Sequence, residues 1–143
     1  MKPVRRSLRI IAFVLYLAAI AFVCFTKADE LKDIPTTWMS FQVDKIAHFL
    51  MFLPFPVLAY LAFSPSEAGF IKKMLVLTFM AGIGLCIAYG TERIQYALGY
   101  RSYDLEDLRA DAIGLSIGYV ISTIGILSGC IRSRSRKKSR KRS

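Results

Sequence analysis

The chain has 143 residues, 55% of them hydrophobic, and a mean hydropathy of +0.44. Its formal net charge is +10, but eight basic residues lie in the tail 132–143, so the rest of the chain is nearly balanced in charge. The apolar residues form long stretches that lack the polar residue at every third or fourth position typical of a water-soluble helix. This composition excludes a soluble helical protein.

Four stretches are apolar almost without interruption and indicate the fold class. They are Ile10–Phe25, Ile46–Phe63, Met74–Tyr89 and Ala112–Ile131. A helix rises about 1.5 Å per residue and the hydrocarbon core is roughly 30 Å thick, so a span needs about 20 residues. The shorter first and third stretches can be lengthened by the snorkelling side chains of Arg9, Lys72 and Lys73. The sequence predicts an all-α polytopic membrane protein, a four-transmembrane-helix bundle.

The ends of the chain differ from its apolar centre. Residues 1–9 form a basic N-terminus, residues 10–131 a four-span membrane domain, and residues 132–143 a basic tail that we expect to be disordered and cytoplasmic. The tail adjoins a span and has no interleaved aromatic residues to stack on bases, so we expect it to contact anionic lipid and not nucleic acid. We expect the first span to remain uncleaved, because Lys27 before Ala28 is a poor signal-peptide cleavage context.

The charges of the connections predict the orientation. The N-terminus, the connection 64–73 and the tail are basic, whereas the connection 26–45 has three basic and four acidic residues and the stretch 90–114 has three basic and five acidic ones. Lys and Arg accumulate on the cytoplasmic side of membrane proteins. We therefore expect a multi-pass protein of the bacterial cytoplasmic membrane, with both termini in the cytoplasm and both acidic connections outside.

Proline and small residues interrupt the predicted spans. Pro54 and Pro56 fall within the second span, where they should kink the helix and free backbone carbonyls that neighbours must satisfy. Gly114, Gly118 and Ser122 recur at steps of four in the fourth span, a spacing that lets helix backbones approach closely. We favour packing within one bundle over homodimerisation as the reason.

The stretch "VDKIAHF", residues 43–49, begins the second span with ionisable groups. Asp44 and His48 are four residues apart and share a helical face, with Lys45 one step round. His48 is the single histidine of the chain. A lone histidine is often only a satisfied core residue, but the third span ends at the same membrane level in "GTERIQ", which places Glu92 and Gln95 on one face. Ionisable groups at that depth tend to face a bundle interior or a water-filled cavity.

The start of the fourth span adds three acids. Asp104, Asp107 and Asp111 recur at steps of three and four, so we expect one face of this helix to point them into the bundle, after Arg101 in the preceding turn. The helix should begin near Ser102 or Tyr103, with Ser102 as its N-cap. The positive N-terminal end of the helix dipole stabilises acids in the first turn, which explains the presence of Asp104 and Glu106. It does not explain Asp111, which lies deeper in the span.

These residues match a family pattern. "DKIAHFLMF" followed by "ERIQYALGYRSYDLEDLRADAIG" resembles the VanZ-like family of small bacterial membrane proteins over about residues 43–119. The family pattern has an Asp-Lys pair, a His and a Phe, then Glu-x-x-Gln, an Arg, an Asp-rich helix start, an Asn, and a Gly three residues later. This chain has Asp111 where the family usually has Asn, and it lacks the family's Pro before the Gly-Arg pair. The resemblance implies a four-helix membrane domain and, through the namesake, an association with low-level resistance to the glycopeptide teicoplanin.

Two hypotheses of function follow for the predicted extracytoplasmic polar pocket. In the first, the protein is a non-enzymatic envelope protein whose polar groups lock the bundle and bind a lipid, a glycopeptide or a partner. In the second, it is an enzyme acting on a lipid-linked or phosphorylated envelope substrate. The candidate catalytic residues are His48, Asp44, Glu92 and Asp107, and the candidate substrate-binding residues are Lys45, Gln95, Arg101, Asp104 and Asp111.

We predict no metal and no cofactor. Cys24, Cys86 and Cys130 lie within apolar segments at spacings without a metal or redox signature. A divalent ion held by His48, Glu92 and the aspartates is chemically conceivable. Carboxylates at helical spacing are weak evidence for such a site.

Overall fold

The structure, a computed structural model, describes residues 3–25, 39–65, 68–99 and 104–140, and for residues 3, 39–44, 134 and 136–140 it describes the backbone alone. The described residues form five helices and no strand. In chain order these are α1 (Pro3–Phe25), α2 (Met39–Phe52), α3 (Phe55–Phe63), α4 (Phe70–Ala97) and α5 (Leu105–Arg140). The prediction of an all-α protein is confirmed.

Four segments of these helices are long and apolar enough to cross a membrane. They are Val4–Phe25, Lys45–Phe63, Phe70–Ala97 and Leu105–Ser133. Large apolar side chains cover their outer surfaces, for example Phe22, Ile71 and Phe79, each at least 66% exposed. Exposed apolar surface of this extent is unfavourable in water but not against lipid chains. The chain is a multi-pass membrane protein with four spans.

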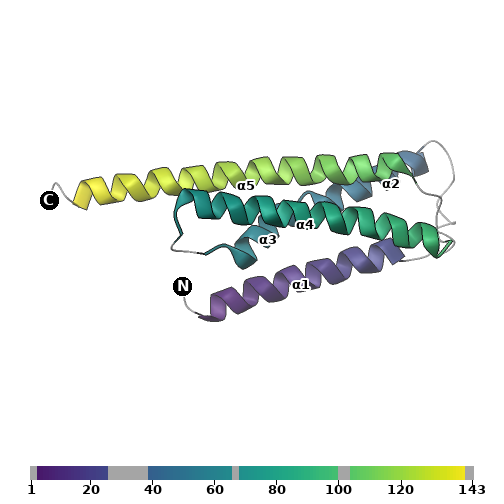
Figure 1. Cartoon of the computed structure of the whole chain (residues 1–143), viewed down its shortest axis with the longest axis horizontal. Helices are drawn as coiled ribbons and strands as arrows, with labels where there is room; N and C mark the ends of the chain where they lie inside the picture. Colours follow the sequence, from purple (N-terminus) through teal and green to yellow (C-terminus); the bar gives the residue numbers. More distant parts are fainter. Residues whose placement is uncertain (1–2, 26–38, 66–67, 100–103, 141–143) are drawn as a thin grey trace.

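The helices run alternately along the bundle, so both ends of the chain lie at one end of it (Figure 1). The opposite end, which we call the distal end, is where α1 and α4 finish and α2 and α5 begin. Helix α5 packs against α2, α3 and α4, while α1 packs against α3 and α4. The polar residues discussed below lie at the distal end.

The second span is broken where prolines were predicted to kink it. Helix α2 ends just before Leu53–Pro54 and α3 starts just after them. The two prolines Pro54 and Pro56 have no N–H to donate to the preceding turn. The hydroxyl of Tyr16 on α1 donates a hydrogen bond to the backbone carbonyl of Met51 beside the break. A neighbouring span therefore satisfies one of the carbonyls near the kink, as expected.

Two glycines of α5 allow that helix to touch the backbone of the kinked span. A Cβ atom at Gly114 would lie 2.5 Å from the carbonyl oxygen of Phe49. One at Gly118 would overlap the carbonyl oxygen of Leu53 and lie 2.9 Å from Cδ of Pro56. Neither distance is available to a real side chain, so only glycine permits this approach. Gly114 and Gly118 thus pack against the kinked span of the same chain.

Aromatic side chains form the core between α1 and the kinked span. Phe52 and Phe55, on either side of the break, are fully buried. The rings of Phe13 and Phe55 meet edge to face with centroids 5.5 Å apart, and Phe13 meets Phe63 in the same way at 5.5 Å. This arrangement is favoured by the ring quadrupoles. It fixes α1 against the side of α3.

The C-terminal helix is longer than the apolar stretch that predicted it. Residues 132–140 were expected to be disordered, but α5 continues as a helix to Arg140. Lys and Arg have high helix propensity, and positive charges near a helix C-terminus interact favourably with its dipole. Disorder was predicted because this tail lacks apolar residues. The helical propensity of its basic residues explains why α5 nevertheless continues to Arg140.

Candidate functional site

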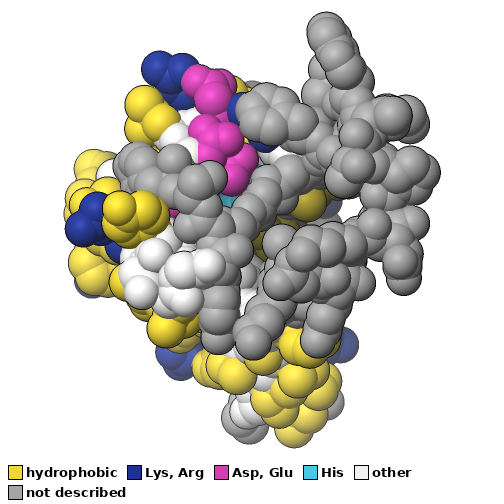
Figure 2. Space-filling model, turned by 90° about the vertical axis from the view of Figure 1, so that its right-hand side faces the viewer, with side chains coloured by type: hydrophobic (Ala, Val, Ile, Leu, Met, Phe, Trp, Pro, Cys, Tyr) yellow, Lys and Arg dark blue, Asp and Glu magenta, His cyan; other side chains and the backbone are white. Residues whose placement is uncertain are grey.

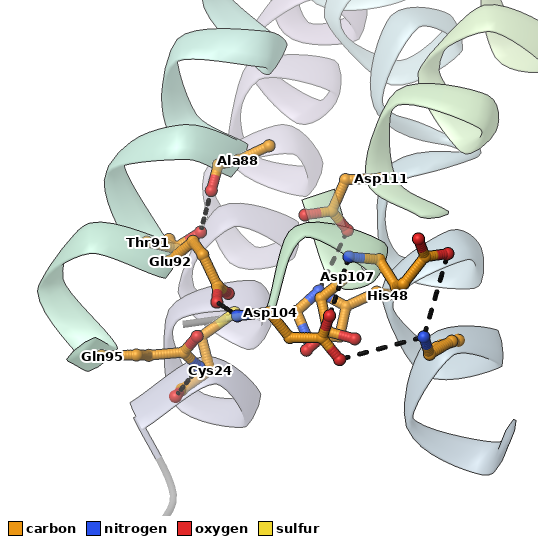
Figure 3. A network of polar contacts seen from close by, with 11 residues as sticks. Cys24, His48, Ala88, Thr91, Glu92, Gln95, Asp104, Asp107 and Asp111 are labelled. Carbon is orange, nitrogen blue, oxygen red and sulfur yellow. Dashed lines mark hydrogen bonds and ion pairs between the residues drawn. The ribbon is translucent and has the colours of Figure 1, made fainter. Parts of the chain in front are cut away.

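Four ionisable side chains from three helices are buried together near the distal end. They are His48 on α2, Glu92 on α4, and Asp107 and Asp111 on α5, each at most 4% exposed. Figure 3 shows them directed toward one another between the helices. We call these four residues the distal polar cluster. Charged groups are rarely buried without partners, so the contacts within this set determine what it can do.

His48 lies between the two aspartates of α5. Its Nδ1 atom is 3.1 Å from Oδ1 of Asp111, and its Nε2 atom is 3.9 Å from Oδ2 of Asp107. Asp107 and Asp111 are four residues apart, so α5 presents both on one face, one turn apart. A carboxylate of Asp111 accepts a hydrogen bond from Nδ1–H, which fixes the orientation of the imidazole ring. The ring is thus bracketed by two carboxylates.

Glu92 connects the end of α4 to the start of α5. Its Oε1 atom accepts a hydrogen bond of 2.9 Å from the backbone N–H of Asp104. Oδ1 of Asp104 in turn accepts a hydrogen bond of 2.8 Å from the backbone N–H of Glu106. Asp104 is therefore the N-cap of α5. The expected start near Ser102 or Tyr103 is wrong by a few residues, since the described helix begins at Leu105 and its cap is an aspartate.

Gln95 lies one turn beyond Glu92 on α4 and joins it to α1. Its Nε2 atom donates a hydrogen bond of 2.5 Å to the backbone carbonyl of Cys24. That carbonyl belongs to the last turn of α1, where helical partners are missing. The side chain of Gln95 is only 3% exposed, and no donor among the described residues reaches its Oε1 atom. A buried amide oxygen without a donor is rare and points to a missing partner.

Lys45 lies at the rim of the cluster. Its Nζ atom is 3.8 Å from Oδ2 of Asp104 and 4.0 Å from Oε2 of Glu106, and all three side chains are partly exposed. Partly exposed ion pairs of this length contribute little to stability. Acidic side chains gather at this end of the bundle (Figure 2). The rim thus carries both signs of charge above the buried groups.

The structure brings together most of the residues that the sequence pointed to. The side chains of His48, Glu92, Gln95, Asp107 and Asp111 are buried at the distal end, and Lys45 and Asp104 lie at its rim. The side chain of Asp44 and all of Arg101 lie outside the described residues. Asp44 was predicted to share a helical face with His48, and the described carboxylate that contacts Nδ1 of His48 is that of Asp111. The carbonyl of Cys24 could not be predicted from the sequence, since a backbone partner leaves no mark in residue type.

The distal polar cluster is rich in negative charge and hydrogen-bond acceptors. It contains three carboxyl groups and one imidazole, and the charges of His48, Asp107 and Asp111 lie close enough to act on Glu92. Such a set can exchange protons through His48 or accept hydrogen bonds from a ligand. Within the described part of the chain, no group of three or more His, Cys, Asp or Glu side chains has the geometry to hold a metal ion.

Comparison with known proteins identifies the family. No curated protein and no solved structure gives a significant match to the chain. A family model described as VanZ/LLP1 matches residues 10–127. This range includes the first three predicted spans, all but the last four residues of the fourth, and every residue of the distal polar cluster. With its four apolar spans and this match over most of its length, the chain belongs to the VanZ/LLP1 family.

Proposed function

We propose that this VanZ-like protein resides in the bacterial cytoplasmic membrane as an envelope protein with an extracytoplasmic polar pocket. The pocket is formed around His48, Glu92, Asp107 and Asp111 and binds an envelope ligand. Through that ligand the protein reduces susceptibility to glycopeptides of the teicoplanin type, the property associated with the family's namesake. Family membership supports the link to resistance.

One observation carries the proposal: four ionisable side chains from α2, α4 and α5 are buried against one another at one end of a membrane bundle. Charged residues within spans are costly and face a bundle interior or cavity where they serve a function. A purely structural role is the weaker explanation, because apolar side chains of similar volume stabilise a helix interface equally well. Three carboxyl groups with one histidine would stabilise the packing of the helices poorly.

The distribution of charge supports an outward-facing cluster. The described basic residues Arg5, Arg6, Arg9, Lys72 and Lys73 lie on the helix segments at one end of the bundle, and the described acids Glu92, Asp104, Glu106 and Asp107 lie at the distal end. Positive residues are retained in the cytoplasm. With both termini cytoplasmic, the cluster lies near the outer leaflet, where envelope precursors and glycopeptides meet the membrane.

A second candidate function is enzymatic, and the geometry of His48 favours it. Asp111 holds the Nδ1 side of the imidazole, and the other nitrogen faces Asp107 at 3.9 Å. A histidine oriented by one carboxylate and facing another acid is suited to general acid–base chemistry. In this case a lipid-linked or phosphorylated envelope substrate would exchange a proton with His48, while Lys45 and Arg101 would bind its anionic group.

The proposed function is tested by teicoplanin susceptibility in a strain that depends on this protein for its phenotype. We expect His48→Gln, Glu92→Gln and Asp107→Asn to abolish the protection that the wild-type protein gives. Each variant preserves side-chain size and polarity. Glu106→Gln is the matched control, because Glu106 is an exposed acid of the same helix end, and it should protect like wild type.

Protein levels in the membrane and thermal stability in detergent are measured for every variant. Loss of protection at normal level and stability supports a ligand site, whereas full protection by the three cluster variants would contradict the proposal. The enzymatic alternative is separated by comparing the envelope lipids of cells with wild-type and His48→Gln protein. An enzyme produces a lipid species that disappears in the variant, while a binder leaves the lipid composition unchanged.

A further inference from the structure

The distal polar cluster has more hydrogen-bond acceptors than donors around Glu92 and Gln95. The Oε1 atom of Glu92 accepts from the backbone N–H of Asp104, and Nε2 of Gln95 is engaged with the carbonyl of Cys24. The Oε1 atom of Gln95 has no donor within reach among the described residues, although its side chain is 3% exposed. The orientation of the amide follows from its contact, because only the NH₂ group can donate to a carbonyl.

The charge of the side chains around Gln95 also favours a ligand that donates hydrogen bonds. The buried carboxylate of Glu92 accepts from the backbone N–H of Asp104, and among the described residues it forms no ion pair with a cationic side chain. Among the described cations, Lys45 lies at the rim, paired at 3.8 Å and 4.0 Å with Asp104 and Glu106. Buried carboxylates are stable only when paired with positive charge or strong donors. A bound group that is cationic and rich in N–H would supply both.

We propose that the pocket takes a primary ammonium group, which places one N–H on Oε1 of Gln95 and its charge beside the carboxylate of Glu92. This proposal rests on the proposed function of the distal polar cluster as a ligand pocket. Glu92 and Gln95 are three residues apart on one face of α4, both buried, and Figure 3 shows both side chains on the same side of that helix. The neutral amide and the carboxylate thus form one recognition edge.

The chemistry of this edge excludes other ligand classes. At these two side chains a phosphate would bring its oxygens against the carboxylate of Glu92 and the acceptor atom of Gln95, neither of which is a donor or carries positive charge. A quaternary ammonium has the charge but no N–H for Gln95. A primary ammonium has three N–H donors on a compact charge, so it satisfies the amide oxygen and a carboxylate together.

Two sources can supply such a group at the end of a membrane span. One is the headgroup of an aminolipid of the phosphatidylethanolamine type, whose nitrogen lies at the membrane surface. The other is a soluble molecule with a primary amine. The recognition by Glu92 and Gln95 is the same for both, and the experiment distinguishes them.

The test uses the full-length protein in nanodiscs of phosphatidylcholine and phosphatidylglycerol, with Tm as the readout. Replacing part of the phosphatidylcholine by phosphatidylethanolamine should raise Tm by about 5 °C if occupancy is high. Phosphatidyl-N,N-dimethylethanolamine, with fewer N–H groups, should raise it less. In the soluble arm, ethanolamine and choline are added to discs without phosphatidylethanolamine. A shift with ethanolamine and not with choline identifies a soluble amine as sufficient, and a shift with the lipid alone identifies an aminolipid.

Each variant is compared with its own ligand-free Tm, so a change in basal stability does not affect the result. Glu92→Gln keeps the acceptor for Asp104 and removes the charge, and Gln95→Met removes the amide oxygen. Both should weaken the response to the amine by about 10- to 100-fold in concentration, the usual effect of losing a charge-assisted hydrogen bond. Glu106→Gln should respond like wild type.

An unchanged Tm of the wild-type protein both when phosphatidylethanolamine replaces phosphatidylcholine and when ethanolamine is added would overturn the proposal, with or without the variants. So would a shift with Zn²⁺ or Mn²⁺, lost in His48→Gln, in the absence of any amine effect. The teicoplanin assay distinguishes failure of the ammonium proposal from failure of the proposed function. If Glu92→Gln loses teicoplanin protection but the amines give no shift, the pocket stands and the ligand class is wrong. If all cluster variants protect fully, the proposed function fails whatever the amines do.

Discussion

The Nδ1 atom of His48 and the Oδ1 atom of Asp111 lie 3.1 Å apart across the interface of α2 and α5, and both side chains are buried. This contact requires a hydrogen-bond acceptor at position 111. An asparagine, the residue that the family resemblance leads us to expect at this position, has an oxygen in the same place. The departure from the family pattern therefore leaves the geometry of the contact intact.

Asp111→Asn is expected to fold with a stability within about 1 kcal/mol of wild type, because the amide oxygen still accepts from Nδ1–H of His48. Asp111→Leu, of similar volume, leaves the imidazole without this acceptor and should lower the free energy of unfolding by about 3 kcal/mol or more. Thermal unfolding in detergent measures both. Equal stability of the Asn and Leu variants would show that the contact does not stabilise the interface.

Gly118→Ala is expected to destabilise the bundle by about 1–3 kcal/mol, because the new methyl group overlaps the carbonyl oxygen of Leu53 and forces the helices apart. Gly125→Ala is the matched control on the same helix. No atom lies within 4 Å of a Cβ atom at Gly125, so that variant should be neutral or gain up to about 1 kcal/mol from helix propensity. Comparable Tm values for the two variants would contradict the close packing of α5 against the kink.

Tyr16→Phe removes the hydroxyl that donates to the carbonyl of Met51 beside the break in the second span. We expect a loss of about 1 kcal/mol, since a part-buried carbonyl loses its donor while the packing of the ring is retained. Tyr89→Phe, at a ring that is 51% exposed, should change Tm little. A Tyr16→Phe protein as stable as the Tyr89→Phe protein would show that another group satisfies this carbonyl.

The proposed orientation is tested by cysteine labelling of intact cells with a membrane-impermeant maleimide. In a background with Cys24, Cys86 and Cys130 replaced by alanine, Glu106→Cys should be labelled from outside. Gly69→Cys, in the exposed turn at the opposite end, should be labelled only after the cells are permeabilised. The reverse pattern would place the distal polar cluster on the cytoplasmic side and overturn the proposed pocket for envelope ligands.

The four spans were predictable because the apolar stretches are uninterrupted and long compared with the hydrocarbon core. The kink was predictable as well, since Pro54 and Pro56 remove backbone donors whatever surrounds them. Helix ends were less predictable. The start of α5 at Leu105 depends on capping by Asp104, and the helical tail to Arg140 depends on the propensity of basic residues, neither of which appears in an apolar pattern.

The sequence by itself determined the helical class, the four spans, and the helical faces that carry His48, Glu92, Asp107 and Asp111. These follow from hydropathy and from the 3.6-residue period, which are local properties of a chain. Only the tertiary structure decided the partners: Asp111 at Nδ1 of His48, the N–H of Asp104 at Glu92, and the Cys24 carbonyl at Gln95. Those contacts join residues 12 to 71 positions apart. They depend on how the kinked span and α5 approach each other at Gly114 and Gly118, which no local pattern specifies.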